Sequence, residues 1–258
     1  MGTINVTDSG AVRTIAIARP ERRNALDYAT VLALRDAFND AGGQSDIRSL
    51  VLAGGEGIFS AGADVKEWAQ EKADGPDHDW VAAAMEMMEA IYSFPKPTIA
   101  MIDGAAAGAG VDIALCCDFR FASERAKFIC SYTRVGYPPD AGSSWLLPRT
   151  IGLENAKRFV FTGDVWDAQT ALANRLVSEL HPVGELQQAV MNFAGRLASG
   201  PTVALGLAKT LLNEAGSRTF SEQLKAEKAA GLICSETADH LEGLAAANER
   251  RNPVFIGR

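Results

Sequence analysis

The sequence has few of the residues that disulfide frameworks and zinc sites require. Its 258 residues include four cysteines and three histidines. The cysteines are Cys116, Cys117, Cys130 and Cys234, and their spacing fits neither a disulfide framework nor a paired CxxC metal site. The histidines, His78, His181 and His240, are too far apart for the HxH or HxxxH spacing of zinc hydrolases. We therefore expect no bound metal and a reducing, cytoplasmic environment.

Long hydrophobic runs and an excess of positive charge are also lacking. No stretch approaches the ~18 apolar residues that a membrane-spanning helix needs, and no basic region followed by an apolar one comes after Met1. The 25 Lys and Arg against 32 Asp and Glu leave a net charge of −7, which repels polyanions. We expect a soluble protein that contacts neither membranes nor nucleic acid.

Three common catalytic and nucleotide-binding motifs are missing. There is no GxSxG nucleophile elbow and no GxxxxGK[ST] phosphate loop. Residues 108–113 begin like a dinucleotide fingerprint but lack its third glycine. Nucleotide binding there is kept as a minor alternative.

The apolar and charged fractions, 47% and 22%, are those of an ordinary globular protein. Apolar strands at 12–18 and 48–53 flank a helix that Asp27 is placed to cap, a β-α-β pattern. The pattern recurs in a helix at 79–93, a strand at 98–103, a helix at 108–116 and short strands at 119–122, 127–130 and 176–180. The remainder predicts helices at 184–198, 201–215 and 220–250. We therefore predict an α/β core over residues 1–195 and a helical region over 196–258.

Two loops rich in small residues follow buried strands, FSAGAD at 59–64 and GAAAGAG at 104–110. Such loops let a ligand approach the backbone, and free amides at a helix start favour an anion. Asp64 is placed to cap the next helix, and Asp112 lies about one turn after Ala109. Alternatively, both loops are tight turns that need small residues only for packing.

Two backbone N–H groups aimed at one oxygen form an oxyanion hole. Because the sequence has no Ser/His or Cys/His nucleophile set, the anion is better interpreted as an enolate than as a tetrahedral acyl intermediate. An enolate requires a carboxylate base.

With these loops side by side, the chain resembles the crotonase (enoyl-CoA hydratase/isomerase) superfamily nearly from end to end. The matching segments are Arg19-Pro20, Asn24-Ala25-Leu26, 59–64, Pro95-Lys96-Pro97, 104–110, Cys117-Asp118, Pro148-Arg149, Ser199-Gly200-Pro201 with Lys209, and 250–255. The resemblance implies a spiral of ββα units, a helical C-terminal region that assembles a trimer or a dimer of trimers, and a coenzyme A thioester as substrate, with no permanently bound cofactor.

The resemblance also implies site residues. The amides of Ala63 and Ala109 would hold the thioester oxygen. The positions implied for coenzyme A and the acyl group are Arg22, Arg23, Ala25, Ala61, Asp64, Val65, Lys66, Gly108 and Tyr132. Arg22, Arg23 and Lys66 are candidates for the phosphates, and Arg250, Arg251 and Arg258 are candidates across a subunit boundary.

The acidic positions separate the reactions within the family. Hydratases carry two glutamates where this chain has Asp112 and Tyr132. Tyr132 is a poor base, since an unperturbed tyrosine has a pKa near 10; it donates a hydrogen bond or, as we favour, lines the acyl pocket. An aspartate at the position of Asp140 resembles double-bond isomerases, although a turn residue after two prolines is the simpler interpretation.

We therefore predict a double-bond shift in an enoyl-CoA, with Asp140 as base and Asp112 as an orienting group or second proton carrier. The alternatives are hydration with Asp112 activating water, an aryl-CoA dehalogenase-like reaction and a non-catalytic acyl-CoA binding protein. Dehalogenation is disfavoured because residues 80–92 contain no histidine.

Overall fold

The computed structural model describes residues 2–74 and 79–258, so His78 lies outside the described residues. A six-stranded sheet has the order β1-β2-β3-β4-β6-β9. Its strands are β1 (Ile4–Ser9), β2 (Val12–Ile17), β3 (Ser49–Gly54), β4 (Thr98–Ile102), β6 (Phe119–Ser123) and β9 (Glu179–His181). β1 and β2 are antiparallel, and every other neighbouring pair is parallel. A smaller sheet is formed by β5 (Ala105–Ala107), β7 (Lys127–Ile129) and β8 (Val165–Asp167).

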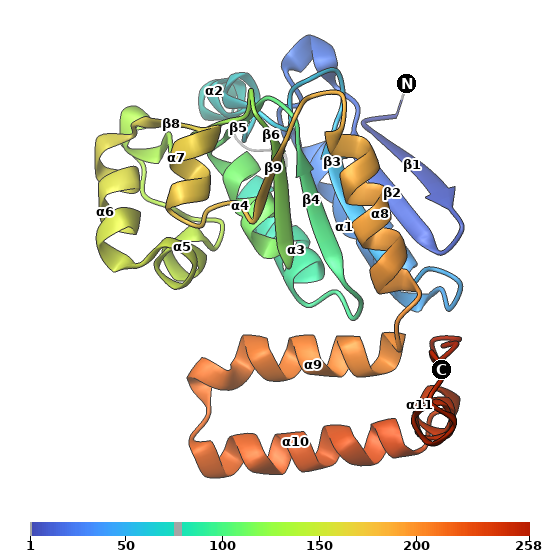
Figure 1. Ribbon diagram of the computed structural model, residues 1–258. Coiled ribbons are helices and arrows are strands. Elements are labelled where there is room, and N and C mark those ends of the chain that lie inside the picture. The colour runs from blue at the N-terminus through green and yellow to red at the C-terminus, as the bar shows by residue number, and fades with distance from the viewer. Residues whose placement is uncertain (1, 75–78) are drawn as a thin grey trace.

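Helices cover both faces of the large sheet (Figure 1). On one face, α1 (Tyr28–Gly43), α3 (Trp80–Tyr92) and α4 (Ala109–Cys116) enclose the main hydrophobic core, and α8 (Leu186–Ala198) packs on the other. The other helices of the core are α2 (Val65–Asp74), α5 (Ser143–Ile151), α6 (Leu153–Thr162) and α7 (Ala168–Ala173). The C-terminal helices are α9 (Thr202–Glu214), α10 (Phe220–Ser235) and α11 (Ala238–Glu249).

Local sequence accounts for the elements that position the site. Asp27 caps α1 by accepting a hydrogen bond from the Thr30 amide at 2.8 Å. All but the last residue of β3 are buried, as expected of a strand that helices cover on both faces. The predicted β-α-β pattern is confirmed for β2, α1 and β3 and for α3 and β4.

Three sequence predictions differ from the structure. The strand predicted at 176–180 is displaced to β9, because Leu176 and Val177 are buried in the core before the chain becomes extended. The helix predicted over 220–250 is divided between α10 and α11, because the Thr237 side chain accepts from the His240 amide and starts a new helix. The core boundary predicted near residue 195 falls inside α8, whose Ala198 is still buried.

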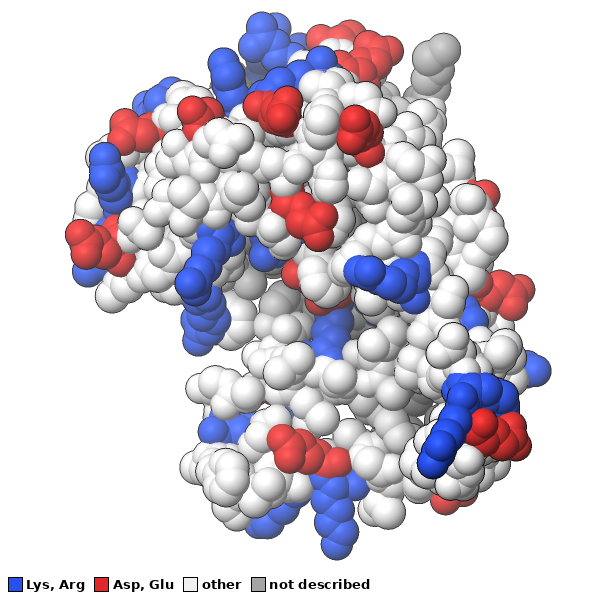
Figure 2. All heavy atoms as spheres, viewed as in Figure 1, with Lys and Arg blue, Asp and Glu red and all other residues white. Residues whose placement is uncertain are grey.

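The C-terminal helices leave the core after residue 200 and lie beneath it, with α9 and α10 running side by side (Figure 1). Arg48 ties them to the core by donating to the Gly200 carbonyl at 2.5 Å and to Thr202 Oγ1 at 2.9 Å. On the face shown in Figure 2, positive and negative side chains are interspersed. Within residues 2–74 and 79–258, no helix is long and apolar enough to cross a membrane.

Candidate active site

The two small-residue loops are in direct contact. Isolated parallel bridges join Leu26 to Ala63 and Ser60 to Ala106. Gly62 has a φ of +87°, and a Cβ there would come within 2.5 Å of the Ala107 carbonyl oxygen and 3.3 Å of the Ala109 nitrogen. Only glycine fits this position, because both the backbone conformation and the space exclude a side chain.

The contact places two free backbone donors next to each other. Ala109 is the first residue of α4, and the amides of the first helical turn have no intrahelical acceptor. Among the described residues, neither the Ala63 nor the Ala109 N–H donates to a protein acceptor, whereas the flanking amides of Asp64 and Gly108 do. These two N–H groups can donate hydrogen bonds to one ligand oxygen at the positive, N-terminal end of α4.

Asp112 is fully buried one turn into α4 and is held by Tyr132, whose hydroxyl donates to its Oδ2. Burial raises the pKa of Asp112 to about 7, although the Tyr132 hydroxyl acts in the opposite direction and the charge of Asp140 adds to the rise. Near neutral pH its carboxyl group can therefore both hold and release a proton. Tyr132 thus acts as a hydrogen-bond donor, which is one of the two roles that the sequence analysis gave it.

Asp140 lies between the Pro138-Pro139 turn and the start of α5, and its Oδ2 is buried. Burial raises the pKa of Asp140 as well. Its side chain lines a cavity of about 300 Å³ whose other walls come from α3, α4 and α5. Asp140 is therefore not a solvent-facing turn residue.

Three buried oxygens in this region have no protein partner among the described residues. They are Asp112 Oδ1, Asp140 Oδ2 and Ser143 Oγ. Buried polar atoms are rarely left unpaired, so a group of three close to free amides is typical of a site that a ligand completes. Ser143 was not anticipated from sequence; its only local signal is a hydroxyl at the start of a helix after Gly142, whose φ is +94°.

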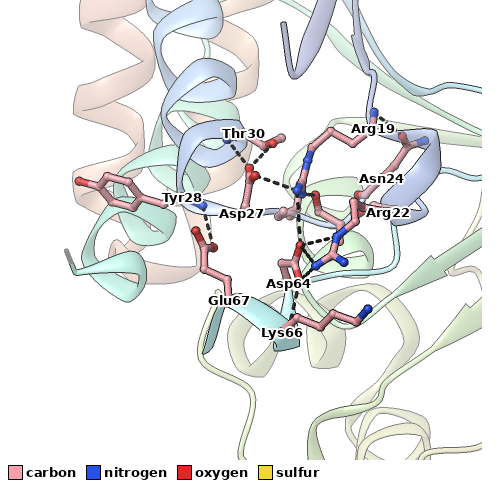
Figure 3. A network of polar contacts seen from close by, with 12 residues as sticks. Arg19, Arg22, Asn24, Asp27, Tyr28, Thr30, Asp64, Lys66 and Glu67 are labelled. Carbon is pink, nitrogen blue, oxygen red and sulfur yellow. Dashed lines mark hydrogen bonds and ion pairs between the residues drawn. The ribbon is translucent and has the colours of Figure 1, made fainter. Parts of the chain in front are cut away.

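The positions implied for coenzyme A divide into two groups. Asp64 is buried and accepts from Arg22 Nη2 at 2.8 Å and from the Lys66 amide at 3.2 Å, so it caps α2 as expected (Figure 3). Burial alone would raise the pKa of Asp64, but its bonds to Arg22 and to the Lys66 amide hold it below the usual value. Asp64 and Arg22 thus form an ion pair with each other, and we interpret this pair as structural.

The second group faces solvent. Ala61, Val65, Arg23 and Lys66 are exposed, and the Lys66 side chain extends away from the cluster around Asp64 (Figure 3). Ala25 is buried, and Gly108 is buried within the second loop. The C-terminal arginines lie elsewhere: Arg251 is paired with Glu242 Oε1 at 2.5 Å.

Asp112 makes stability depend on pH. Its folded pKa of about 7 exceeds the ordinary value near 3.9, so its stabilising contribution is complete below about pH 4 and is lost as pH rises through 7. The loss amounts to at most about 4 kcal/mol. We expect Asp112→Asn to raise the free energy of unfolding relative to the parent at pH 8 but not at pH 4, as measured by urea titration.

Asp103→Asn is the matched control. In the parent, Asp103 accepts hydrogen bonds from Arg125, which hold the pKa of its carboxyl group below the ordinary value. Removing this carboxylate should therefore lower the free energy of unfolding at pH 8. Equal destabilisation of Asp112→Asn at both pH values would contradict the raised pKa.

Similarity to known proteins extends over nearly the whole chain. The sequence profile of the enoyl-CoA hydratase/isomerase family matches residues 7–258. The crotonyl-CoA hydratase of Syntrophomonas wolfei is 32% identical over 243 residues, which cover 94% of this chain and 93% of that protein. The 1,2-epoxyphenylacetyl-CoA isomerase of Escherichia coli is 31% identical over 252 residues, covering 96% and 95%. A crystal structure of an enoyl-CoA hydratase from Bacillus anthracis has a TM-score of 0.92 at 32% identity and covers 99% of this chain and 100% of that chain.

Proposed function

The chain belongs to the enoyl-CoA hydratase/isomerase family and has the crotonase fold, and from that premise we propose that it shifts a carbon–carbon double bond of an enoyl-CoA. The observation that carries the proposal is the buried, unpartnered Oδ2 of Asp140 beside an apolar cavity. Tyr132 stands where a hydratase has its second glutamate, and its hydroxyl already donates to Asp112. The site thus offers Asp140 as a base with a buried, unpartnered oxygen at the wall of this cavity.

The reaction uses an enolate. The amides of Ala63 and Ala109 donate to the thioester oxygen, which stabilises the negative charge formed when a proton leaves the neighbouring carbon. Asp140 takes that proton, the double bond moves by one position, and the same carboxyl group returns the proton two carbons further along. Asp112, whose pKa burial raises to about 7, adds a second proton carrier held in place by Tyr132.

Coenzyme A would approach from the exposed side of the loops. Arg23 and Lys66 are solvent-facing cations next to the amide pair and are suited to its phosphates. Arg22 contributes less directly, because its guanidinium is already paired with Asp64.

Hydration is the second candidate, and the pKa of Asp112 favours it. A carboxyl group with a pKa of about 7 is matched to general-base catalysis at neutral pH, so Asp112 can activate water. Relatives at about the same identity are named both as hydratases and as an isomerase.

A panel of 3-enoyl-, 2-enoyl- and dienoyl-CoA thioesters discriminates between these functions. We expect 3-enoyl-CoA to be converted to 2-enoyl-CoA faster than 2-enoyl-CoA takes up water, with hydrogen–deuterium exchange at the α-carbon. Faster water addition would favour hydration. Tight binding without exchange would favour a binding protein.

We also propose that the C-terminal region, residues 199–258, assembles the protein into a trimer or a dimer of trimers. Within α10 only Ala230 is buried, while Phe220, Leu232 and Ile233 are 79%, 61% and 53% exposed. Exposed apolar helices of this kind are typical of subunit interfaces. Sedimentation equilibrium should give a mass of three or six chains, and a monomer at micromolar concentration would contradict the proposal.

A further inference from the structure

An aromatic pair forms part of the wall of the cavity beside Asp140. Tyr92 is the last residue of α3, Trp145 lies in the first turn of α5, and their ring centroids are 5.6 Å apart in an edge-to-face arrangement. The guanidinium of Arg149 lies over the Trp145 ring, 3.6 Å from its centroid. These contacts hold the indole in one orientation.

A second, larger hollow of about 480 Å³ lies beyond this pair, between the core and α9. The molecular surface is hollowed where the core meets the C-terminal helices (Figure 2). Four residues line both spaces: Tyr92, Cys116, Trp145 and Leu146. Cys116 and Leu146 are buried in the core, whereas Trp145 is 42% exposed and Tyr92 is partly exposed. Of the four residues that line both cavities, Tyr92 and Trp145 are therefore the ones whose side chains can be shortened without opening the hydrophobic core.

The walls of the smaller cavity also restrict the charge of its occupant. Met85, Met88 and Trp145 supply apolar surface, while Glu89 and Asp140 supply carboxyl groups. Among the described residues that line it, none is Lys, Arg or His. A ligand carrying a terminal carboxylate would meet like charge there, because the Arg149 guanidinium lies over the Trp145 ring and is not among the residues that line this cavity.

We propose that this cavity takes an uncharged, apolar acyl group and that Tyr92 and Trp145 form the end wall that limits its length. The inference rests on the proposed function, because that function places the acyl chain beside Asp140. A cavity of ~150 Å³ holds the six carbons of benzene. The present volume of about 300 Å³ is twice as large and therefore suits about twelve carbons.

Binding of saturated acyl-CoA thioesters tests the wall independently of the reaction, since they have no double bond to move. For butyryl- to palmitoyl-CoA, we expect calorimetric affinity to rise about fourfold per methylene up to about dodecanoyl and then to level off. In Trp145→Ala the rise should continue through the longer chains. Trp145→Phe, which keeps an aromatic ring, should retain the parent limit.

Tyr92→Ala opens the same wall from α3 and replaces Trp145→Ala if that variant does not fold. An unchanged chain-length limit in a folded Ala variant, or no limit in the parent, would overturn the proposal.

Adipyl-CoA should bind on the order of tenfold more weakly than hexanoyl-CoA, and equal binding would overturn the charge restriction. If 2-enoyl-CoA takes up water faster than 3-enoyl-CoA is isomerised while Trp145→Ala moves the limit, the proposed function fails and the wall stands.

Discussion

Asp140→Asn is expected to lower kcat for the isomerisation of 3-enoyl-CoA by ~10²- to 10⁴-fold, the usual contribution of a general base. The amide keeps the size of the carboxyl group but cannot accept a proton. Because burial raises the pKa of Asp140, the parent should lose kcat/KM on the acid side at a pH above the ordinary aspartate value near 3.9. The measurement is a steady-state rate together with α-carbon exchange in deuterium oxide.

Glu86→Gln is the control for this variant. Glu86 lies on the outer side of α3, where it pairs with Arg35 at 2.7 Å and keeps 61% of its side chain exposed. Its loss should leave kcat unchanged. If Asp140→Asn keeps parental isomerisation while Asp112→Asn abolishes it, the base has been assigned to the wrong carboxylate. Water addition to 2-enoyl-CoA that survives Asp140→Asn but not Asp112→Asn would favour hydration.

Ala109→Pro is expected to lower kcat by ~10²- to 10³-fold, because it removes one of the two N–H donors to the developing oxyanion. Proline is tolerated at the first position of a helix, which is where Ala109 lies in α4. The preceding Gly108, at φ +50° and ψ −124°, is outside the helical region that proline disfavours in its neighbour. The substitution therefore removes the donor with little change to the helix.

Ala109→Gly keeps the N–H and should retain most of the activity. Circular dichroism and the affinity for a saturated acyl-CoA then show whether Ala109→Pro has kept the fold and the cavity. A small effect on affinity with a large effect on kcat is the expected pattern. Parental kcat in a folded Ala109→Pro would show that this amide does not hold the thioester oxygen.

Sequence alone was sufficient for the fold class and the two loops, because local rules determine both. Strands covered on both faces are continuously apolar, and helix caps are read from single residues such as Asp27. The loops were found because close backbone contact demands small residues, and Gly62 is a direct example: a Cβ would lie 2.5 Å from the Ala107 oxygen. Asp112 and Asp140 were identifiable as candidates through the family resemblance.

What each candidate contacts was decided by the tertiary structure. Tyr132 donates to Asp112 across 20 positions, and Arg22 pairs with Asp64 across 42. Neither partnership has a periodic signal, because sequence patterns report on neighbours within one or two turns. The wall formed by Tyr92 and Trp145 is likewise invisible in sequence, since its rings come from α3 and α5 and meet only when both helices pack around the same cavity. The sequence thus determined which functional groups the site contains. Long-range packing determined the pKa values of these groups, their hydrogen-bond partners and the cavity that they face.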